Sequence, residues 1–171
     1  KALMMAVIGA ESMNTGARIC AAHIDSPRMD LKPNPLYEDA GMAFLKTHYY
    51  GGIKKYQWVT VPLALHGVVV RKDSTSVTIT IGEDENDPIL MITDLLPHLA
   101  ADQMQKTAGA VIAGEQLNVL LGSEPLEGEG SDLVKLHMMK LLNDKYGIIE
   151  EDFLSAELNI VPAAKCREVG L

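Results

Sequence analysis

The stretch Ala22-His23-Ile24-Asp25-Ser26-Pro27-Arg28 decides how this sequence is interpreted. An apolar run over residues 17–22, interrupted by one arginine, leads into it and predicts a strand that is buried on both faces. Pro27 holds the residue before it in extended geometry and ends regular strand pairing. We therefore expect His23 and Asp25 at the end of that strand or just past it.

His23 and Asp25 have the spacing of a metal-binding imidazole and its supporting carboxylate. Residues two apart on a strand point to the same side, with their Cα atoms about 6–7 Å apart. At that distance a carboxylate can accept the N–H of the imidazole, which leaves the other ring nitrogen free to bind a metal ion. The alternative is a pair that only satisfies itself at a strand end, because short patterns also match by chance.

The residues around this pair resemble a known family of metallopeptidases. The stretch from Ala22 to Lys32 resembles the segment that carries the first zinc ligand in the aspartyl aminopeptidase/vacuolar aminopeptidase I family, most closely its bacterial branch. The resemblance continues in the family's order through residues 46–58, 94–100 and 155–159, and so covers nearly the whole chain. It implies a cytoplasmic zinc-dependent aminopeptidase that hydrolyses N-terminal residues from peptides and holds two Zn²⁺ ions in each active site.

The same resemblance implies an α/β fold, which is α+β within this chain. In the family, an αβα zinc-peptidase domain is interrupted after the His-x-Asp motif by a β-rich lid or dimerisation domain. A shift in composition near Trp58 sets the expected division: residues 1–57 in the catalytic domain, 58–153 in the lid, and 154–171 as a return strand. The chain has no initiator Met and stops at Leu171 in mid-pattern, so we expect a fragment.

Three residues receive roles from the resemblance. His23 would be a zinc ligand, and Asp25 the carboxylate that orients its imidazole. His98 would reach the active site of a neighbouring subunit and stabilise the oxyanion of the tetrahedral intermediate. This chain lacks the second histidine that the human-type pattern has nearby, so a plain surface histidine is the alternative for His98. The remaining ligands and the general base are expected beyond Leu171, and this chain alone is not expected to form a dizinc site.

Composition narrows the classes of function. The net charge of −8 and the isoelectric point near 5.0 argue against nucleic acid as a partner. An uncharged apolar run of the roughly 18 residues that a membrane helix requires does not occur in the sequence. Cys20 and Cys166 lack metal or redox spacing and fit a reducing compartment. Peptide substrates and a homo-oligomer formed through the lid are the expected partners.

Hydrophobic periodicity and turn residues predict the secondary structure. Strands are expected at residues 3–9, 17–22, 42–50, 58–71, 77–81, 88–92, 117–121 and 154–161. A helix capped by Ser131 is expected to end at Gly147, and a loop at Pro33–Asp39. Pro62 and Gly67 are expected at bulges or bends.

Two readings compete with a catalytic parent enzyme. In the first, the chain is a non-catalytic, β-rich oligomerisation or assembly module. In the second, it is a binding protein whose His23–Asp25 pair is only structural.

Overall fold

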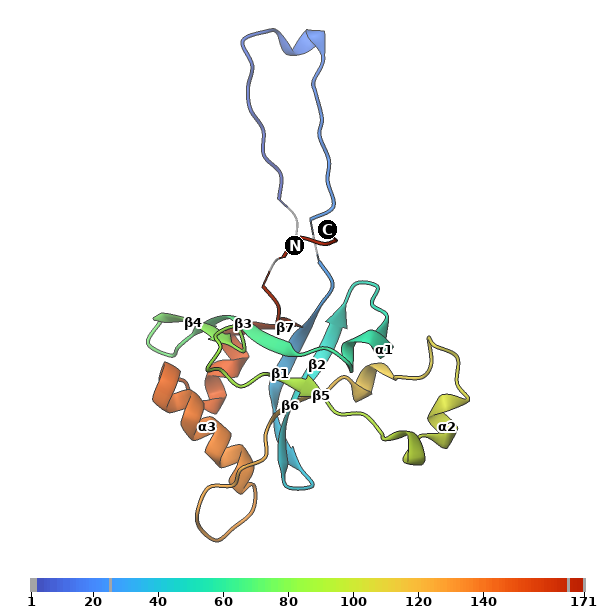
Figure 1. Ribbon diagram of the computed structural model, residues 1–171. Helices are drawn as coiled ribbons and strands as arrows, with labels where there is room; N and C mark the ends of the chain where they lie inside the picture. Colours follow the sequence, from blue (N-terminus) through green and yellow to red (C-terminus); the bar gives the residue numbers. More distant parts are fainter. Residues whose placement is uncertain (1–2, 25, 166, 171) are drawn as a thin grey trace.

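Seven strands form one sheet in the computed structural model, which describes residues 3–24, 26–165 and 167–170. The spatial order is β4-β3-β7-β1-β2-β6-β5, and each pairing is antiparallel. The strands are β1 (Arg28–Asp39), β2 (Met42–Tyr50), β3 (Leu63–Val70), β4 (Ser76–Ile81), β5 (Met91–Ile92), β6 (Val119–Gly122) and β7 (Ala156–Pro162). This mixture of an antiparallel sheet and separate helices confirms the α+β expectation for the chain (Figure 1).

The helices are mostly short. The α-helices are α1 (Lys55–Trp58), α2 (Ala101–Met104) and α3 (Leu133–Tyr146). The 3-10 turns are η1 (Met13–Thr15), η2 (Pro97–Leu99), η3 (Gly114–Gln116) and η4 (Glu150–Ser155). Within the described part of the chain, none of these helices combines the length and the apolar character that crossing a membrane requires.

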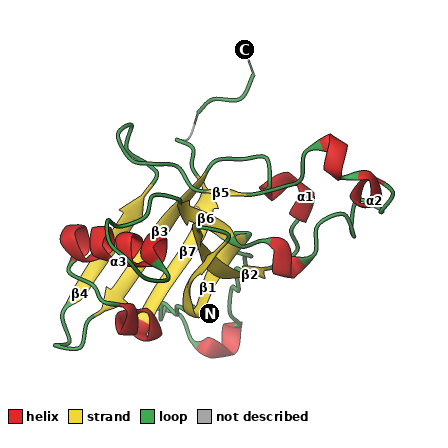
Figure 2. Cartoon of the chain, turned by 90° about the horizontal axis from the view of Figure 1, so that it is seen from below, coloured by secondary structure: helices red, strands yellow, loops and turns green. Residues whose placement is uncertain are grey.

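The sheet curls so that the start of β3 contacts the residue before edge strand β5. Leu63 at the start of β3 exchanges two backbone hydrogen bonds with Leu90, at 2.8 and 2.9 Å, just before edge strand β5. Helix α3 lies across the sheet in Figure 2 and contributes Val134, Met138 and Leu142 to the core. The curled sheet and this helix therefore enclose one apolar interior.

Strand alternation separates that interior from a polar outer face. In β7, Leu158 and Ile160 are buried in the core, whereas Asn159 between them is only partly buried. Burying side chains of this size stabilises the fold by roughly 1.5–3 kcal/mol each, as an upper estimate. The period-two pattern thus sets which face of each central strand packs inward.

Gly67 allows β3 and β7 to approach each other closely. Its φ of +151° disfavours any side chain, and a Cβ there would lie 1.9 Å from the carbonyl oxygen of Glu157. Of the bulge or bend predicted at Gly67, the bulge is wrong, because the register of β3 is continuous through this residue on both sides. Residue 67 must therefore be glycine, because the backbone of β7 leaves no space for a side chain there.

A residue from the first hairpin caps α3. The N-cap residue is Asp132, with a φ of +58°, and its side chain makes no capping hydrogen bond, so the cap predicted at Ser131 is wrong. Glu38 instead accepts from the backbone N–H groups of Val134 and Lys135 through Oε2, at 2.9 and 3.0 Å. A carboxylate there satisfies free N–H groups and complements the helix dipole. The predicted end at Gly147 is confirmed, with φ +66°.

Residues 3–24 do not form the strands predicted at 3–9 and 17–22. They run as an extended, exposed arm that stands away from the sheet in Figure 1, with η1 at its tip. Ile19, predicted to be buried, is 89% exposed. A strand exists only when a neighbour takes up its N–H and C=O groups, and no such neighbour lies among the described residues.

The loop predicted at residues 33–39 is also wrong, because β1 continues to Asp39. A shift in register between Leu31 and Leu36 accommodates two prolines that cannot donate ladder hydrogen bonds. β1 and β2 lie before residue 58, yet they share the sheet with the strands after it. The division into domains at residue 58 stays a prediction.

Candidate functional site

His23 lies near the base of the arm. Its side chain is exposed, and no hydrogen bond joins it to another residue within the described ranges. Asp25 lies outside the described residues, so its contact with His23 stays a prediction. Of the site expected at a buried strand end, the described residues therefore include only the imidazole of His23, which is exposed and outside any strand.

His98 lies on η2, in the loop between β5 and β6. Pro97 occupies the first position of this turn, and the N–H groups of Leu99 and Ala100 donate to Leu96 and Pro97. The imidazole is exposed, and within the described part of the chain no residue hydrogen-bonds to it. The side chain of His98 is therefore accessible to solvent and to a second molecule.

The structure does not bring the two candidate histidines together. The arm that carries His23 and the η2–α2 loop that carries His98 project from different sides of the sheet in Figures 1 and 2. Among the described residues, no three His, Cys, Asp or Glu side chains gather closely enough to hold a metal ion. Zinc sites use three or four protein ligands, so the described residues of this chain do not fit a complete zinc site by themselves.

Two other histidines mark the ends of a polar row on the outer face. His66, Asn159, Asp30 and His48 lie opposite one another on β3, β7, β1 and β2. Three strand intervals separate the Cα atoms of the two histidines by about 14 Å, too far for the imidazoles to share an ion. Nε2 of His66 lies 2.9 Å from Oε1 of Glu83, which gives this ring a partner.

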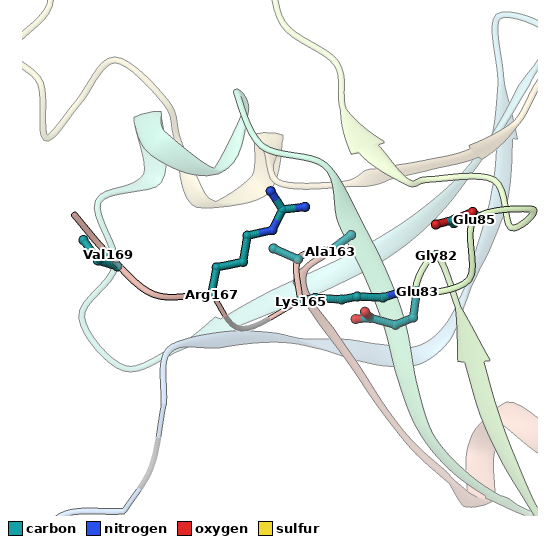
Figure 3. A pocket seen from close by; sticks show the side chains of 8 residues that line it. Gly82, Glu83, Glu85, Ala163, Lys165, Arg167 and Val169 are labelled. Atoms are coloured by element: carbon teal, nitrogen blue, oxygen red, sulfur yellow. The ribbon is translucent and has the colours of Figure 1, made fainter. Parts of the chain in front are cut away.

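A cavity of about 630 Å³ lies where the turn after β4 meets the segment that follows β7. Glu83 and Glu85 line it from the turn, and Lys165 and Arg167 from the later segment. Figure 3 shows Lys165 extending toward Glu83. Sequence reasoning missed this cavity, because its two walls are about 80 residues apart in the chain and neither carries a motif. Neither His23 nor His98 lines it.

The family model described as Aminopeptidase I zinc metalloprotease (M18) matches residues 2–171 of this chain. The chain belongs to the M18 family. This confirms the resemblance to metallo-aminopeptidases that the motifs at residues 22–32, 46–58, 94–100 and 155–159 indicated. Zinc is the metal that the family's description names.

Bacterial M18 aminopeptidases are similar to this chain over nearly all of it. A probable M18 family aminopeptidase 1 of Clostridium acetobutylicum is 60% identical over 171 residues, which is 99% of this chain and 37% of the relative. Its counterpart in Thermotoga maritima is 48% identical over 161 residues, 94% of this chain and 35% of the relative. This M18 chain thus spans about a third of the length of these relatives.

Solved structures of the same family share the fold. The crystal structure of aminopeptidase I from Clostridium acetobutylicum superposes with a TM-score of 0.85 at 55% identity, over 95% of this chain and 36% of that one. The M18 aminopeptidase of Thermotoga maritima gives a TM-score of 0.82 at 51% identity, over 88% and 33%. The sheet described above is therefore an M18 sheet.

Proposed function

We propose that this chain is part of a zinc-dependent aminopeptidase that hydrolyses N-terminal residues from peptides. The observation that carries the proposal is the match of residues 2–171 to a family of zinc metalloproteases. The 60% identity to a probable aminopeptidase over the same residues supports it further. Because the relatives are nearly three times as long, the activity is proposed for the longer protein.

In that protein His23 would bind zinc, and Asp25 would orient its imidazole. A single imidazole falls short of the three or four ligands that zinc requires. The other ligands and the general base would come from the remainder of the protein, which would hold two Zn²⁺ ions in each site. When bound, the metal would polarise the scissile carbonyl and activate a water molecule.

His98 would act from a second subunit as a hydrogen-bond donor to the oxyanion. Its exposure on η2 supports this role, because a donor for another subunit has to be accessible in the isolated chain. We propose that the β-rich part of the chain serves as the lid through which copies associate. We further propose that the enzyme works in the cytoplasm.

The domain division is proposed in the form predicted, with the catalytic part up to residue 57 and the lid over 58–153. The arm of residues 3–24 is exposed in this chain, and this exposure supports the proposal that the rest of the protein completes the catalytic part. Residues 154–171 would return the chain to it. In the shared sheet, β2 is hydrogen-bonded to β6 of the lid, and β1 to β7 of the returning segment.

The metal assignment is tested by measuring zinc content and peptide turnover of the longer protein and of its His23→Ala variant. We expect about two metal ions in each wild-type active site, and loss of metal and turnover in the variant. His137→Ala is the matched control, since His137 lies on α3 and donates from Nδ1 to the carbonyl oxygen of Glu124, 2.8 Å away. Wild-type zinc content and wild-type turnover in His23→Ala would show that His23 is not a zinc ligand.

The role of His98 is tested in the same protein with His98→Ala. Removing one oxyanion donor lowers kcat by roughly 10²- to 10³-fold. Zinc content should stay unchanged, because His98 is not a proposed ligand. A variant that loses zinc would show that His98 has a different role.

A further inference from the structure

The loop that carries His98 is closed by one contact between side chains. Oδ1 of Asp94 accepts from Nε2 of Gln103 at 2.9 Å, and also from the backbone N–H of Leu95 at 2.8 Å. Asp94 follows β5, and Gln103 belongs to α2, so the contact joins the two ends of the segment that contains His98. Few other contacts hold this segment, whose large side chains point to solvent.

The exposed side chains show how little else anchors the turn. Leu95, Leu96, Leu99 and Met104 are each between 53% and 74% exposed, whereas Ala100 at 3% is the buried residue of the segment. One methyl group buries too little apolar surface to fix the orientation of a ten-residue loop. Backbone bonds within η2 and α2 shape the turn locally but do not connect its two ends.

We propose that Asp94 and Gln103 act as positioning residues for His98. This inference rests on the role proposed above for His98. The imidazole has no hydrogen-bond partner within the described residues, so its position depends on the backbone of η2 that carries it. The Asp94–Gln103 bond fixes that backbone at both ends, and a donor placed in advance loses less entropy when the oxyanion forms.

The experiment uses the longer, zinc-loaded protein and compares Asp94→Ala with Asp94→Asn. The alanine variant loses both accepted hydrogen bonds, whereas the asparagine oxygen can still accept them. A misplacement of about 1 Å costs up to roughly a hundredfold, so we expect kcat of Asp94→Ala to fall ten- to a hundredfold. KM and zinc content should stay near wild type, and Asp94→Asn should recover most of kcat.

Two further variants separate positioning from a general loss of fold. Asp102→Ala removes an exposed carboxylate from the same loop and should leave kcat unchanged. Gln103→Leu removes the donor of the bond and should reproduce the defect of Asp94→Ala. Amide hydrogen exchange of residues 95–104 should be faster in Asp94→Ala than in Asp94→Asn, while exchange in the central strands should stay the same.

A double-mutant cycle with His98→Ala decides the assignment. If Asp94 acts through His98, Asp94→Ala should have no further effect on kcat once His98 is absent. An equal effect in both backgrounds, or wild-type kcat in Asp94→Ala beside an impaired His98→Ala, would overturn the positioning role alone. Wild-type kcat in His98→Ala would instead overturn the proposed role of His98, and the positioning role with it.

Discussion

The arm of residues 3–24 and the central sheet both contain segments that predict strands, but only those of the sheet form them. Residues 17–22 in the arm form an apolar run with one arginine, and residues 77–81 in β4 alternate apolar residues with threonine; both patterns predict strands. Val77 to Ile81 pairs with β3 along its whole length, whereas the described arm residues pair with no strand. The difference teaches that the apolar pattern predicts a strand only when a partner is available.

The same contrast applies to the two candidate histidines. His98 sits on a turn that the sheet supports through β5 and β6. His23 sits on the arm, whose side chains contact little of the chain. The turn that carries His98 is therefore formed within this chain, whereas we expect the surroundings of His23 to depend on the rest of the protein. Substitutions matched between arm and sheet test this contrast.

The largest difference is expected between Gly67→Ala and Gly9→Ala. A Cβ at Gly67 would overlap the backbone of β7, and the φ of +151° adds strain. Together these effects should lower the free energy of unfolding by about 4 kcal/mol. Gly9 in the arm has no atom within 4 Å of its would-be Cβ, so its variant should match wild type in urea denaturation. Comparable losses would mean that the arm is packed in solution.

A somewhat smaller difference is expected between Ile160→Ala and Ile19→Ala. Ile160 is fully buried and Ile19 is 89% exposed. The first change should cost about 3 kcal/mol of unfolding free energy, and the second no more than about 0.5 kcal/mol. Both are measured by urea denaturation of this chain. In the longer protein, where we propose that the rest of the chain completes the catalytic part, the arm should be covered and the cost of Ile19→Ala should rise. An unchanged cost there would contradict that proposal.

Removing the cap of α3 should have a moderate effect. Glu38→Ala leaves two backbone N–H groups of the first helical turn without their acceptor, which costs about 1 kcal/mol. Glu11→Ala removes an exposed carboxylate from the arm and is the matched control. Thermal unfolding of both variants measures the difference. Equal melting temperatures would show that Glu38 does not cap the helix in solution.

The smallest effect concerns the pH dependence of Asp87. The backbone N–H of Gly82 and the ammonium group of Lys145 hold the pKa of Asp87 below its ordinary value of 3.8. A carboxyl whose folded pKa is lowered stabilises the fold above about pH 4, and this contribution is lost as the pH falls through the folded pKa. Lys145→Met should move the pKa of Asp87 toward 3.8 in a carbon-13 NMR titration.

Asp73 is the internal control for that titration. Its pKa is lowered chiefly by the Thr75 hydroxyl and backbone N–H in the β3–β4 turn, so Lys145→Met should not move it. An unchanged pKa for Asp87 in the variant would show that backbone hydrogen bonds, chiefly that from Gly82, lower it without Lys145.

Local patterns predicted much of the sheet and the end of its main helix. β2 was predicted at its observed bounds, and β4 and β7 within two residues of theirs. The errors occurred where a distant residue decides the outcome. Glu38 caps a helix that begins almost a hundred residues later, and Gly67 is required by the backbone of β7. Neither partner can be identified from the sequence around these positions.

The sequence by itself determined the family of this chain and the residues proposed for its chemistry. Motifs such as His23-Ile24-Asp25 are contiguous, so their resemblance needs no knowledge of the fold. Only the tertiary structure decided that β1 and β2 join the sheet, that the arm stays unpaired, and that Asp94 and Gln103 close the loop of His98. Hydrogen bonds and burial join residues that are distant in the chain, and those relations exist only once it has folded.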